Sequence, residues 1–322
     1  MFMSLKKKFL VIGSNGQIGT VLTNKLGEKH GFKNVVGSDL RAPEQQTKFV
    51  FEECSVLDKD RLEKIISKYS ITDVYLLAAY LSAKGEKNID NAWDLNINGL
   101  LNVLNFAKEK KIQKIFWPSS IAVFGPTTPK NNVDQYAITE PTTIYGVSKL
   151  AGESLCNYYH KKFGIDVRSI RYPGLIGWES MPGGGTTDYA VDIFHEAIKN
   201  EEYSCFLSEN RTLPMMYMDD AIKATISIME APIASIKIRN SYNLSSLSFS
   251  PKQIESEIKK HIKSFKVIYS PDERDKLAEG WPQSINDNHS RKDWGWEPNF
   301  NLTQMVNDII LNLSKRYKKE KV

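Results

Sequence analysis

Apolar and polar positions along the first half of the chain predict strands separated by helices. An apolar run at residues 8–13 is typical of a buried strand, and a helical pattern follows it from Gly16 to about Glu28. The same succession continues downstream, with strands expected at 34–38, 73–78, 112–118 and 165–172, and helices at 59–69, 92–110 and 145–163. Strands separated by helices of this length pair in parallel through right-handed crossovers. The pattern therefore predicts an α/β fold with a doubly wound parallel sheet.

From about Pro173 the pattern becomes less regular, with glycine-rich and proline-marked loops between helices. Ser250 and Pro251 are typical of a helix start, and we expect that helix to continue to about His261. The chain is thus divided into a regular first part, residues 1–172, and a smaller C-terminal lobe, residues 173–322, some segments of which return to the sheet. The sequence contains neither an internal repeat nor a low-complexity linker, so we expect the lobe to pack on the sheet.

Length and composition agree with a globular protein. The 322 residues are 41% hydrophobic and 25% charged, which is sufficient for a large core. No apolar run reaches the ~18 residues needed to span a bilayer. The basic start MFMSLKKK is followed by an apolar run of only strand length, which is not typical of a secretory signal. We therefore expect a soluble, cytoplasmic protein with no membrane partner.

Charge and cysteine patterns exclude two further classes. The net charge of +5 comes from 43 basic and 38 acidic residues, with basic clusters at 6–8, 108–114 and 315–321 that lack interleaved aromatic residues. We therefore expect no nucleic-acid partner. Cys54, Cys156 and Cys205 are widely spaced and have neither a CxxC pattern nor histidine neighbours, so we expect core residues rather than disulfides or a metal site.

The segment FLVIGSNGQIG places Gly13, Gly16 and Gly19 where a strand turns into a helix. Without side chains the backbone of such a turn can approach a phosphate, and the amides at the helix N-terminus attract it. A glycine triplet alone is weak evidence, because tight turns use glycine for steric reasons. We expect a dinucleotide pyrophosphate here, with three further residues of the turn contacting it, namely Asn15, Gln17 and Ile18.

Asp39 follows the strand expected at 34–38 and lies twenty residues after Gly19. A carboxylate there accepts hydrogen bonds from the adenosine ribose and repels a 2′-phosphate, which favours NAD over NADP. The alternative is that Asp39 only caps a turn. We expect Leu40 and Arg41 to flank the adenine, and the end of the strand at 73–78 to form the wall of the adenosine or ribose site through Leu77, Ala78 and Ala79.

Tyr145 and Lys149 in YGVSK are four residues apart, which places them on one helix face about 6 Å apart along the axis. A free phenol has a pKa of ~10, so a base near neutrality needs a fall of roughly 3 units, about 4 kcal/mol. One positive charge ~4 Å away at an effective dielectric of 20 supplies roughly that energy, and the oxidised nicotinamide adds a second positive charge. We predict that Tyr145 is the acid or base and that Lys149 lowers its pKa and holds the nicotinamide ribose. The alternative is a chance spacing on an ordinary helix.

Ser119 and Ser120 end the strand that contains WPSS, at the carboxyl edge where doubly wound folds place their active sites. A serine hydroxyl at this edge can donate a hydrogen bond to a substrate oxygen beside Tyr145. Of the two residues we select Ser120.

GSNGQIG, Asp39, SSIAVFG and YGVSK together resemble the extended short-chain dehydrogenases, which have a Rossmann fold, and the resemblance covers nearly the whole chain. It implies that Ser120 is the serine four positions before the aromatic Phe124, and that Asn96 supports the catalytic helix and a proton-relay water. The family commonly has an aspartate that bonds the adenine amine. Here CSVLD puts Ser55 at that place with Val56 beside it, and Asp58 is out of register, so the adenine contacts differ.

Within that group, RYPGLIGWESMPGGGTTDYAVDIFHEAI, LSAKGE, WPSSIAVFGPTTP and WPQSINDNHSRKDWGW resemble the NAD-dependent L-threonine 3-dehydrogenases of the short-chain type. The resemblance implies oxidation of L-threonine to L-2-amino-3-ketobutyrate with reduction of NAD, in a homodimer. It implies that the amino-acid end of the substrate is held by Ser82, Gly185, Thr186 and Thr187, with glycines 183–185 as the hinge of a lid. Leu175 is then expected on the nicotinamide side. Trp178 and Trp281 are candidates for the pocket wall, although such large aromatic residues are more often core.

The same apparatus also serves NAD-dependent epimerases and dehydratases of nucleotide sugars, which usually grip a diphosphate through arginines. Four arginines keep this alternative open, namely Arg168, Arg171, Arg211 and Arg291. A binding protein without enzymatic activity is disfavoured, because Tyr145 and Lys149 are both present.

Overall fold

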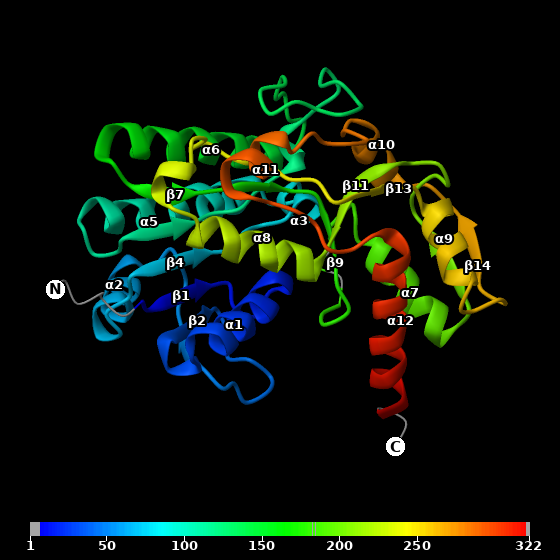
Figure 1. Cartoon of the computed structure of the whole chain (residues 1–322), viewed down its shortest axis with the longest axis horizontal. Helices are drawn as coiled ribbons and strands as arrows, with labels where there is room; N and C mark the ends of the chain where they lie inside the picture. Colours follow the sequence, from blue (N-terminus) through cyan, green and yellow to red (C-terminus); the bar gives the residue numbers. More distant parts are fainter. Residues whose placement is uncertain (1–6, 182, 184, 320–322) are drawn as a thin grey trace.

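The computed structural model describes residues 7–181, 183 and 185–319, and its central feature is a six-stranded parallel sheet (Figure 1). The strand order is β3–β2–β1–β4–β5–β7. In chain order these strands are β1 (Phe9–Ile12), β2 (Val35–Asp39), β3 (Val50–Glu53), β4 (Asp73–Leu76), β5 (Lys114–Phe116) and β7 (Asp166–Arg168). Because β1 lies between β2 and β4, the chain order reverses there, as in doubly wound folds. The predicted fold class is confirmed.

Both faces of this sheet are covered by helices, which explains why its strands are apolar at consecutive positions. On β1, Phe9 and Val11 pack in one apolar cluster with α1 (Gln17–His30) and α8 (Met218–Glu230), whereas Leu10 and Ile12 pack in another. The second cluster contains side chains from α2 (Lys59–Lys68), α5 (Gly99–Lys108) and α6 (Ile144–Phe163). The helix α8 belongs to the second half of the chain and lies against α1.

Two elements predicted as continuous are interrupted in the structure. The strand expected at 165–172 consists of β7 and a separate strand β8 (Ile170–Tyr172), and the strand expected at 112–118 ends at Phe116. The short strand β6 (Ser119–Ser120) joins β8 and β12 (Tyr242–Asn243) in a second parallel sheet. Ser119 and Ser120 therefore lie beyond the main sheet, on a strand that turns toward the C-terminal part.

The helix expected at 92–110 is also interrupted. It consists of α4 (Ile89–Trp93), a π-helical turn η2 (Asp94–Asn98) and α5. Such wide turns are frequent at functional sites, because they reorient side chains relative to a regular helix. Asn96 lies within this turn and is buried.

The C-terminal part has its own apolar core, formed by helices and two small sheets. One sheet is β9–β11–β13 and the other pairs β10 with β14. The helix start at Ser250 is confirmed, since α9 (Pro251–Lys259) begins with a capping box in which Ser250 and Gln253 bond each other's backbone amides. The remaining strands are β9 (Gly174–Ile176), β10 (Glu202–Cys205), β11 (Leu213–Tyr217), β13 (Leu247–Phe249) and β14 (Lys266–Tyr269). The remaining helices are η1 (Phe32–Asn34), α3 (Ser82–Gly85), η3 (Ile121–Val123), α7 (Tyr189–Lys199), η4 (Ile233–Ser235), α10 (Glu273–Glu279), α11 (Asn288–Trp294) and α12 (Leu302–Lys319).

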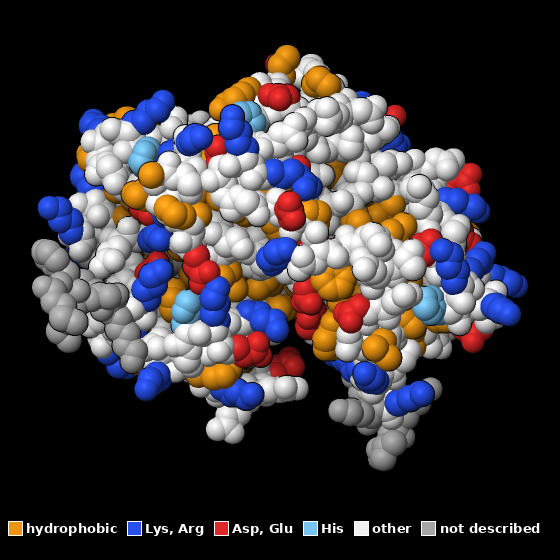
Figure 2. Space-filling model, viewed as in Figure 1, with side chains coloured by type: hydrophobic (Ala, Val, Ile, Leu, Met, Phe, Trp, Pro, Cys, Tyr) orange, Lys and Arg blue, Asp and Glu red, His pale blue; other side chains and the backbone are white. Residues whose placement is uncertain are grey.

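Basic and acidic side chains are interspersed over the face of the molecule shown in Figure 2. None of the helices in the described part of the chain combines the length and apolar character needed to cross a membrane.

Candidate active site

The glycine turn between β1 and α1 is closely packed against its own backbone. Gly13 has a φ of +88°, and a Cβ there would lie 2.7 Å from the backbone nitrogen of Ala78. A Cβ at Gly19 would lie 2.0 Å from the carbonyl oxygen of Gly13. Gly16 differs, because its φ is an ordinary −73° and a Cβ would lie 3.4 Å from that oxygen. Since little in the fold requires glycine at position 16, close approach of a ligand is the remaining reason.

Asp39 ends β2 beside this turn. Its Oδ2 accepts a hydrogen bond from the Asn15 amide (2.9 Å) and its Oδ1 accepts one from the Leu40 amide (2.8 Å). The Asn15 side chain donates to the carbonyl oxygen of Arg41 (2.7 Å). The turn is therefore tied to the end of β2, and the Asp39 carboxylate lines a cavity that also includes Gly13 and Gly16.

That cavity has the place and character of an adenosine site. It continues along the carboxyl ends of β1, β2 and β4 and is lined by Leu40, Cys54, Ser55, Val56, Leu77, Ala78, Ala79 and Leu95. The Ser55 hydroxyl accepts from the Leu57 amide (3.2 Å), and Asp58 caps α2 by accepting from the Arg61 amide. Asp58 is thus committed to the helix, as its register predicts.

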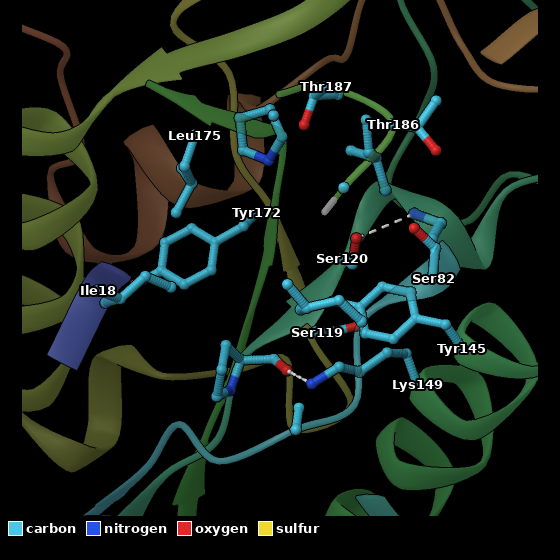
Figure 3. A pocket seen from close by; sticks show the side chains of 18 of the residues that line it. Ile18, Ser82, Ser119, Ser120, Tyr145, Lys149, Tyr172, Leu175, Thr186 and Thr187 are labelled. Carbon is cyan, nitrogen blue, oxygen red and sulfur yellow. Dashed lines mark hydrogen bonds between the residues drawn. The ribbon is translucent and has the colours of Figure 1, made fainter. Parts of the chain in front are cut away.

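A second cavity shares Leu77 and Ala79 with the first and brings together the predicted chemical groups (Figure 3). Tyr145, Lys149 and Ser120 line it, and Ile18 and Leu175 lie on the side toward α1. Gln17, the first residue of α1, also lines it. The side-chain amide nitrogen of Gln17 (Nε2) is buried without a hydrogen-bond partner among the described residues. A buried donor without a partner fits a site that a polar ligand completes. The two connected cavities, the glycine turn and Gln17 fit a bound dinucleotide.

Tyr145 is held in place through its backbone. Helix α6 is capped by the Thr143 hydroxyl, which accepts from the Gly146 amide (3.1 Å). One turn later, the Ser148 hydroxyl donates to the carbonyl oxygen of Tyr145 (2.8 Å) and accepts from the Asn96 amide group (2.9 Å). Asn96 also accepts from the Tyr80 amide (2.8 Å), so the π-helical turn joins α6 to the segment after β4.

The electrostatics of the pair differ from the sequence-based estimate. Burial raises the pKa of Tyr145 to about 12, which a hydrogen bond with Ser120 only partly offsets. Burial also lowers the pKa of Lys149 to about 7, and its ammonium donates to the carbonyl oxygen of Pro118 (2.7 Å) (Figure 3). In the protein alone, Lys149 does not bring the pKa of Tyr145 to neutrality. The sequence-based prediction counted the attraction between the two groups and left out the cost of removing both from water. It also included the positive charge of the oxidised nicotinamide, and that part stays a prediction.

The second cavity is also lined by polar groups. Ser82, Gly185, Thr186 and Thr187 line it together with Trp281, as expected. The Thr186 hydroxyl is buried without a hydrogen-bond partner among the described residues. Trp178 instead packs against the core of the C-terminal part. Of the three hinge glycines, Gly184 lies outside the described residues.

Several expected site residues do not line either cavity. Asn15, Gly19, Arg41 and Asn96 support the walls from behind, through the contacts given above. Sequence reasoning in turn did not select Asp188, Leu81, Tyr172 or Pro173, which line the second cavity. Asp188 directly follows the GGGTT segment and accepts from the Gly185 amide (2.7 Å), so its neighbourhood was the available signal.

The four arginines considered for a diphosphate site are all engaged elsewhere. Arg168 and Arg171 are 1% and 3% exposed and pair with Asp166 and Glu153. In the C-terminal part, Arg211 pairs with Asp275 and Arg291 with Asp287. No arginine is among the described residues that line the two cavities.

Comparison with known proteins places this geometry in a family. Residues 9–245 match the model of the NAD dependent epimerase/dehydratase family. The holo form of a GalE-like L-threonine dehydrogenase from Cupriavidus necator is 50% identical, with a TM-score of 0.93 over 95% of this chain and 99% of that one. A monomeric L-threonine 3-dehydrogenase from a metagenome is 49% identical, with a TM-score of 0.93 over 96% and 99% of the chains. An uncharacterized epimerase/dehydratase from Staphylococcus saprophyticus is 43% identical over 98% of this chain and 99% of its own.

The fold is thus that of the extended short-chain dehydrogenases, a class of Rossmann-fold enzymes. The chain belongs to the NAD-dependent epimerase/dehydratase family. NAD is its cofactor, as the glycine turn and Asp39 predict.

Proposed function

We propose that this chain oxidises L-threonine to L-2-amino-3-ketobutyrate with reduction of NAD. The observation that carries the proposal is the lining of the second cavity. Besides Tyr145 it offers the hydroxyls of Ser82, Thr186 and Thr187 and the carboxylate of Asp188, with no arginine among its described residues. The sequence identity of 49–50% to two L-threonine dehydrogenases, over nearly the whole chain, supports the same substrate.

The polar wall suits a zwitterion. In the proposed complex, hydroxyl groups of Ser82, Thr186 and Thr187 donate to the substrate carboxylate. The Asp188 carboxylate attracts the substrate ammonium while it continues to accept from the Gly185 amide. The buried Thr186 hydroxyl gains in this way the hydrogen bond that it lacks within the protein.

The chemical step is assigned to Tyr145 and Ser120. Tyr145 as phenolate takes the proton of the β-hydroxyl, and Ser120 donates a hydrogen bond to the oxygen that becomes the carbonyl. Bound NAD would supply the acceptor for the hydride that leaves the β-carbon. Lys149 holds the nicotinamide ribose and supplies positive charge beside Tyr145. Asn96 and Ser148 keep Tyr145 in position through its backbone.

An NAD-dependent nucleotide-sugar epimerase or dehydratase is the alternative. Staphylococcal relatives at 43–44% identity carry the name uncharacterized epimerase/dehydratase, which states no substrate. Such substrates carry two phosphates that need cationic partners. The arginines that sequence analysis left open for this role form ion pairs with carboxylates instead. The site geometry therefore favours the smaller, zwitterionic substrate.

The test is NADH formation. Purified protein with NAD should give NADH absorbance with L-threonine, and Tyr145→Phe should lower kcat by at least about 10²-fold while NAD binding persists. Tyr158→Phe is the matched control, since Tyr158 lies exposed on the same helix. L-Serine and simple secondary alcohols serve as comparison substrates. An epimerase would give no net NADH, and a non-catalytic binding protein would bind NAD without turnover; either result would overturn the proposal.

We further propose that the chain forms homodimers through the surface of α4 and α6. Ile89, Trp93 and Val147 on these adjacent helices are 56%, 40% and 41% exposed, which is unusual for large apolar side chains grouped together. Light scattering coupled to size exclusion should give twice the chain mass of 36.6 kDa. Trp93→Glu should shift it to the monomer mass, because it would place a charge in the interface. A monomer mass for the parent protein would contradict the proposal.

A further inference from the structure

Trp117 lies directly against the Lys149 ammonium. It belongs to the connection between β5 and β6 and is 2% exposed. The Lys149 Nζ atom is 4.6 Å from the centroid of its ring, closer than the 5.5 Å to the Tyr145 ring. A positive charge at this distance from an aromatic ring is attracted by its electron-rich face.

The indole ring has little freedom to move away. The Trp117 amide donates to the carbonyl oxygen of Arg168 on the neighbouring strand (3.0 Å). The six-membered ring packs against Gly152, where a Cβ would lie 2.3 Å from it, and Leu100 lies near the same place. The ring is therefore fixed between α6, α5 and the sheet, with Lys149 beside it.

Few other groups compensate the charge of Lys149. Its ammonium is buried, and the described structure gives it one hydrogen bond, to Pro118. The titratable groups that face it are Tyr145, Glu153 and Cys156 on its own helix.

Glu153 is the acidic member of this group, but its charge is already engaged. Both of its oxygens accept from Arg171 on β8 (2.8 and 2.7 Å), and one also accepts from the Ser119 hydroxyl (2.6 Å). Burial raises the pKa of the Cys156 thiol, so this group stays neutral. The aromatic face of Trp117 is thus a principal source of stabilisation for the ammonium.

We propose that Trp117 is a positioning residue of the active site, whose ring stabilises the charged form of Lys149 and thereby extends the pH range in which Tyr145 has a cationic neighbour. The catalytic consequence rests on the proposed function, whereas the contact itself does not. Burial lowers the pKa of Lys149 to about 7, so a modest change in stabilisation alters its charge near neutrality.

The experiment replaces Trp117 site-specifically by tryptophans with increasing numbers of ring fluorines. Fluorine withdraws electron density from the ring face with little change in size. In the active state Tyr145 is ionised and Lys149 is protonated. At acid pH Lys149 is already protonated, so a weaker attraction between the ring and the ammonium leaves the rate unchanged. At alkaline pH the Lys149 ammonium of the active state loses its proton more readily. We therefore expect kcat to fall about tenfold for each unit by which the Lys149 pKa falls.

A second measurement needs no turnover. In the protein without added NAD, Lys149 is charged in both the folded and the unfolded state at pH 6. Fluorination destabilises only the folded state, because the contact between the ring and the ammonium exists only there. Its melting temperature should therefore fall at pH 6. At pH 10 Lys149 is neutral in the folded state, and the difference should vanish. Fluorinated Trp294, which packs against the rings of Tyr242 and Trp296, is the control and should show no pH-dependent difference.

A loss that is equal at all pH values, in rate and in melting temperature, would show that Trp117 only fills space and would overturn the inference. If the protein does not oxidise L-threonine, the proposed function fails in the parent protein. The pH dependence of melting still decides the inference in that case.

Discussion

Asp39 illustrates how one side chain serves both the fold and the cofactor. Its two oxygens accept from the amides of Asn15 and Leu40, which fixes the carboxylate at the rim of the adenosine cavity. Each carboxylate oxygen retains a second lone pair, which is available for a ribose hydroxyl. The turn-cap alternative and the cofactor interpretation are therefore compatible.

Replacing the charge of Asp39 should change the choice of cofactor. In Asp39→Asn, the ribose loses a charged acceptor worth about 1.5–3 kcal/mol, and a 2′-phosphate is no longer repelled. We expect the preference for NAD over NADP, measured as the ratio of kcat/KM values, to fall by about tenfold or more. Asp60→Asn, at an exposed position of α2, should leave the ratio unchanged. An unaltered preference in Asp39→Asn would contradict the assignment.

Tyr145 and Lys149 show what residue spacing can and cannot predict. Their spacing on one helix face follows from the sequence, and the structure brings both to one cavity. Their pKa values depend on burial by β6, η2 and the C-terminal part, which are distant in sequence. Burial disfavours the charged form of each group, which raises one pKa and lowers the other.

At the scale of elements, α6 is held close to the rest of the site by two glycines. A Cβ at Gly146 would lie 2.2 Å from the carbonyl oxygen of Ala122, and one at Gly152 would meet the Trp117 ring. The sequence shows these residues only as poor helix formers. Their reason is the close approach of α6 to η3 and to the segment that carries Ser120.

Gly152→Ala tests this packing. The added methyl group would overlap the Trp117 ring, so either the ring or α6 must move, at a cost of about 1–3 kcal/mol. We expect that loss in the free energy of unfolding measured with urea. We also expect reduced activity, because the Lys149 ammonium lies against the same ring (4.6 Å). Ser154→Ala, at an exposed position of the same helix, should stay within about 0.5 kcal/mol of the parent protein. Unchanged stability in Gly152→Ala would show that the helix has room to adjust.

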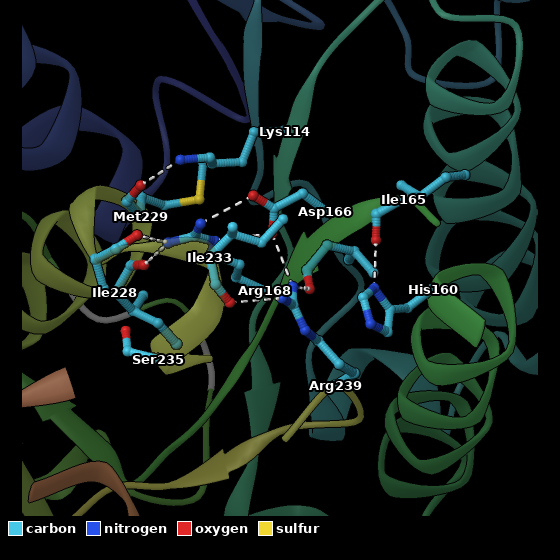
Figure 4. A network of polar contacts seen from close by, with 12 residues as sticks. Lys114, His160, Ile165, Asp166, Arg168, Ile228, Met229, Ile233, Ser235 and Arg239 are labelled. Atoms are coloured by element: carbon cyan, nitrogen blue, oxygen red, sulfur yellow. Dashed lines mark hydrogen bonds and ion pairs between the residues drawn. The ribbon is translucent and has the colours of Figure 1, made fainter. Parts of the chain in front are cut away.

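At the scale of the whole molecule, a polar network joins the two parts of the chain near the first residues of β5 and β7, Lys114 and Asp166 (Figure 4). Arg168 on β7 donates to the carbonyl oxygens of Ile228 and Ala231 at the end of α8, and Lys114 donates to that of Met229 (2.8 Å). Cations at a helix C-terminus complement its dipole. The division of the chain into residues 1–172 and 173–322 remains a prediction. Helix α8 belongs to the second part by sequence, but it packs against α1 of the first part.

Arg168→Met should weaken this connection. It leaves the last carbonyl groups of α8 without their buried donor and removes one partner of Asp166, which keeps Arg239 (2.8 Å). We expect a loss of about 3–5 kcal/mol in unfolding free energy. Relative to the parent protein, hydrogen exchange should become faster in α8, and more so than in α5. Lys114→Met, which removes a single half-buried contact, should cost less. Equal exchange rates in α8 before and after the change would contradict the role of Arg168.

The sequence by itself determined the features that depend on neighbours along the chain. These are most strands and helices of the first half (β3 was not predicted), the glycine turn, the helix face of Tyr145 and Lys149, and the family with its cofactor. Local periodicity and turn chemistry are sufficient for the elements, the turn and the helix face, because each involves fewer than about twenty consecutive residues. The family with its cofactor came from a resemblance that covers nearly the whole chain.

Only the tertiary structure decided which groups face the cavity and in what state of charge. It commits Arg168 and Arg171 to buried ion pairs, interrupts the helix at Asn96 with a π-helical turn, and brings Thr186 and Asp188 to the cavity that Tyr145 lines. The physical reason is that burial and pairing are set by segments far apart in sequence. The free energy of a charge depends on everything packed around it.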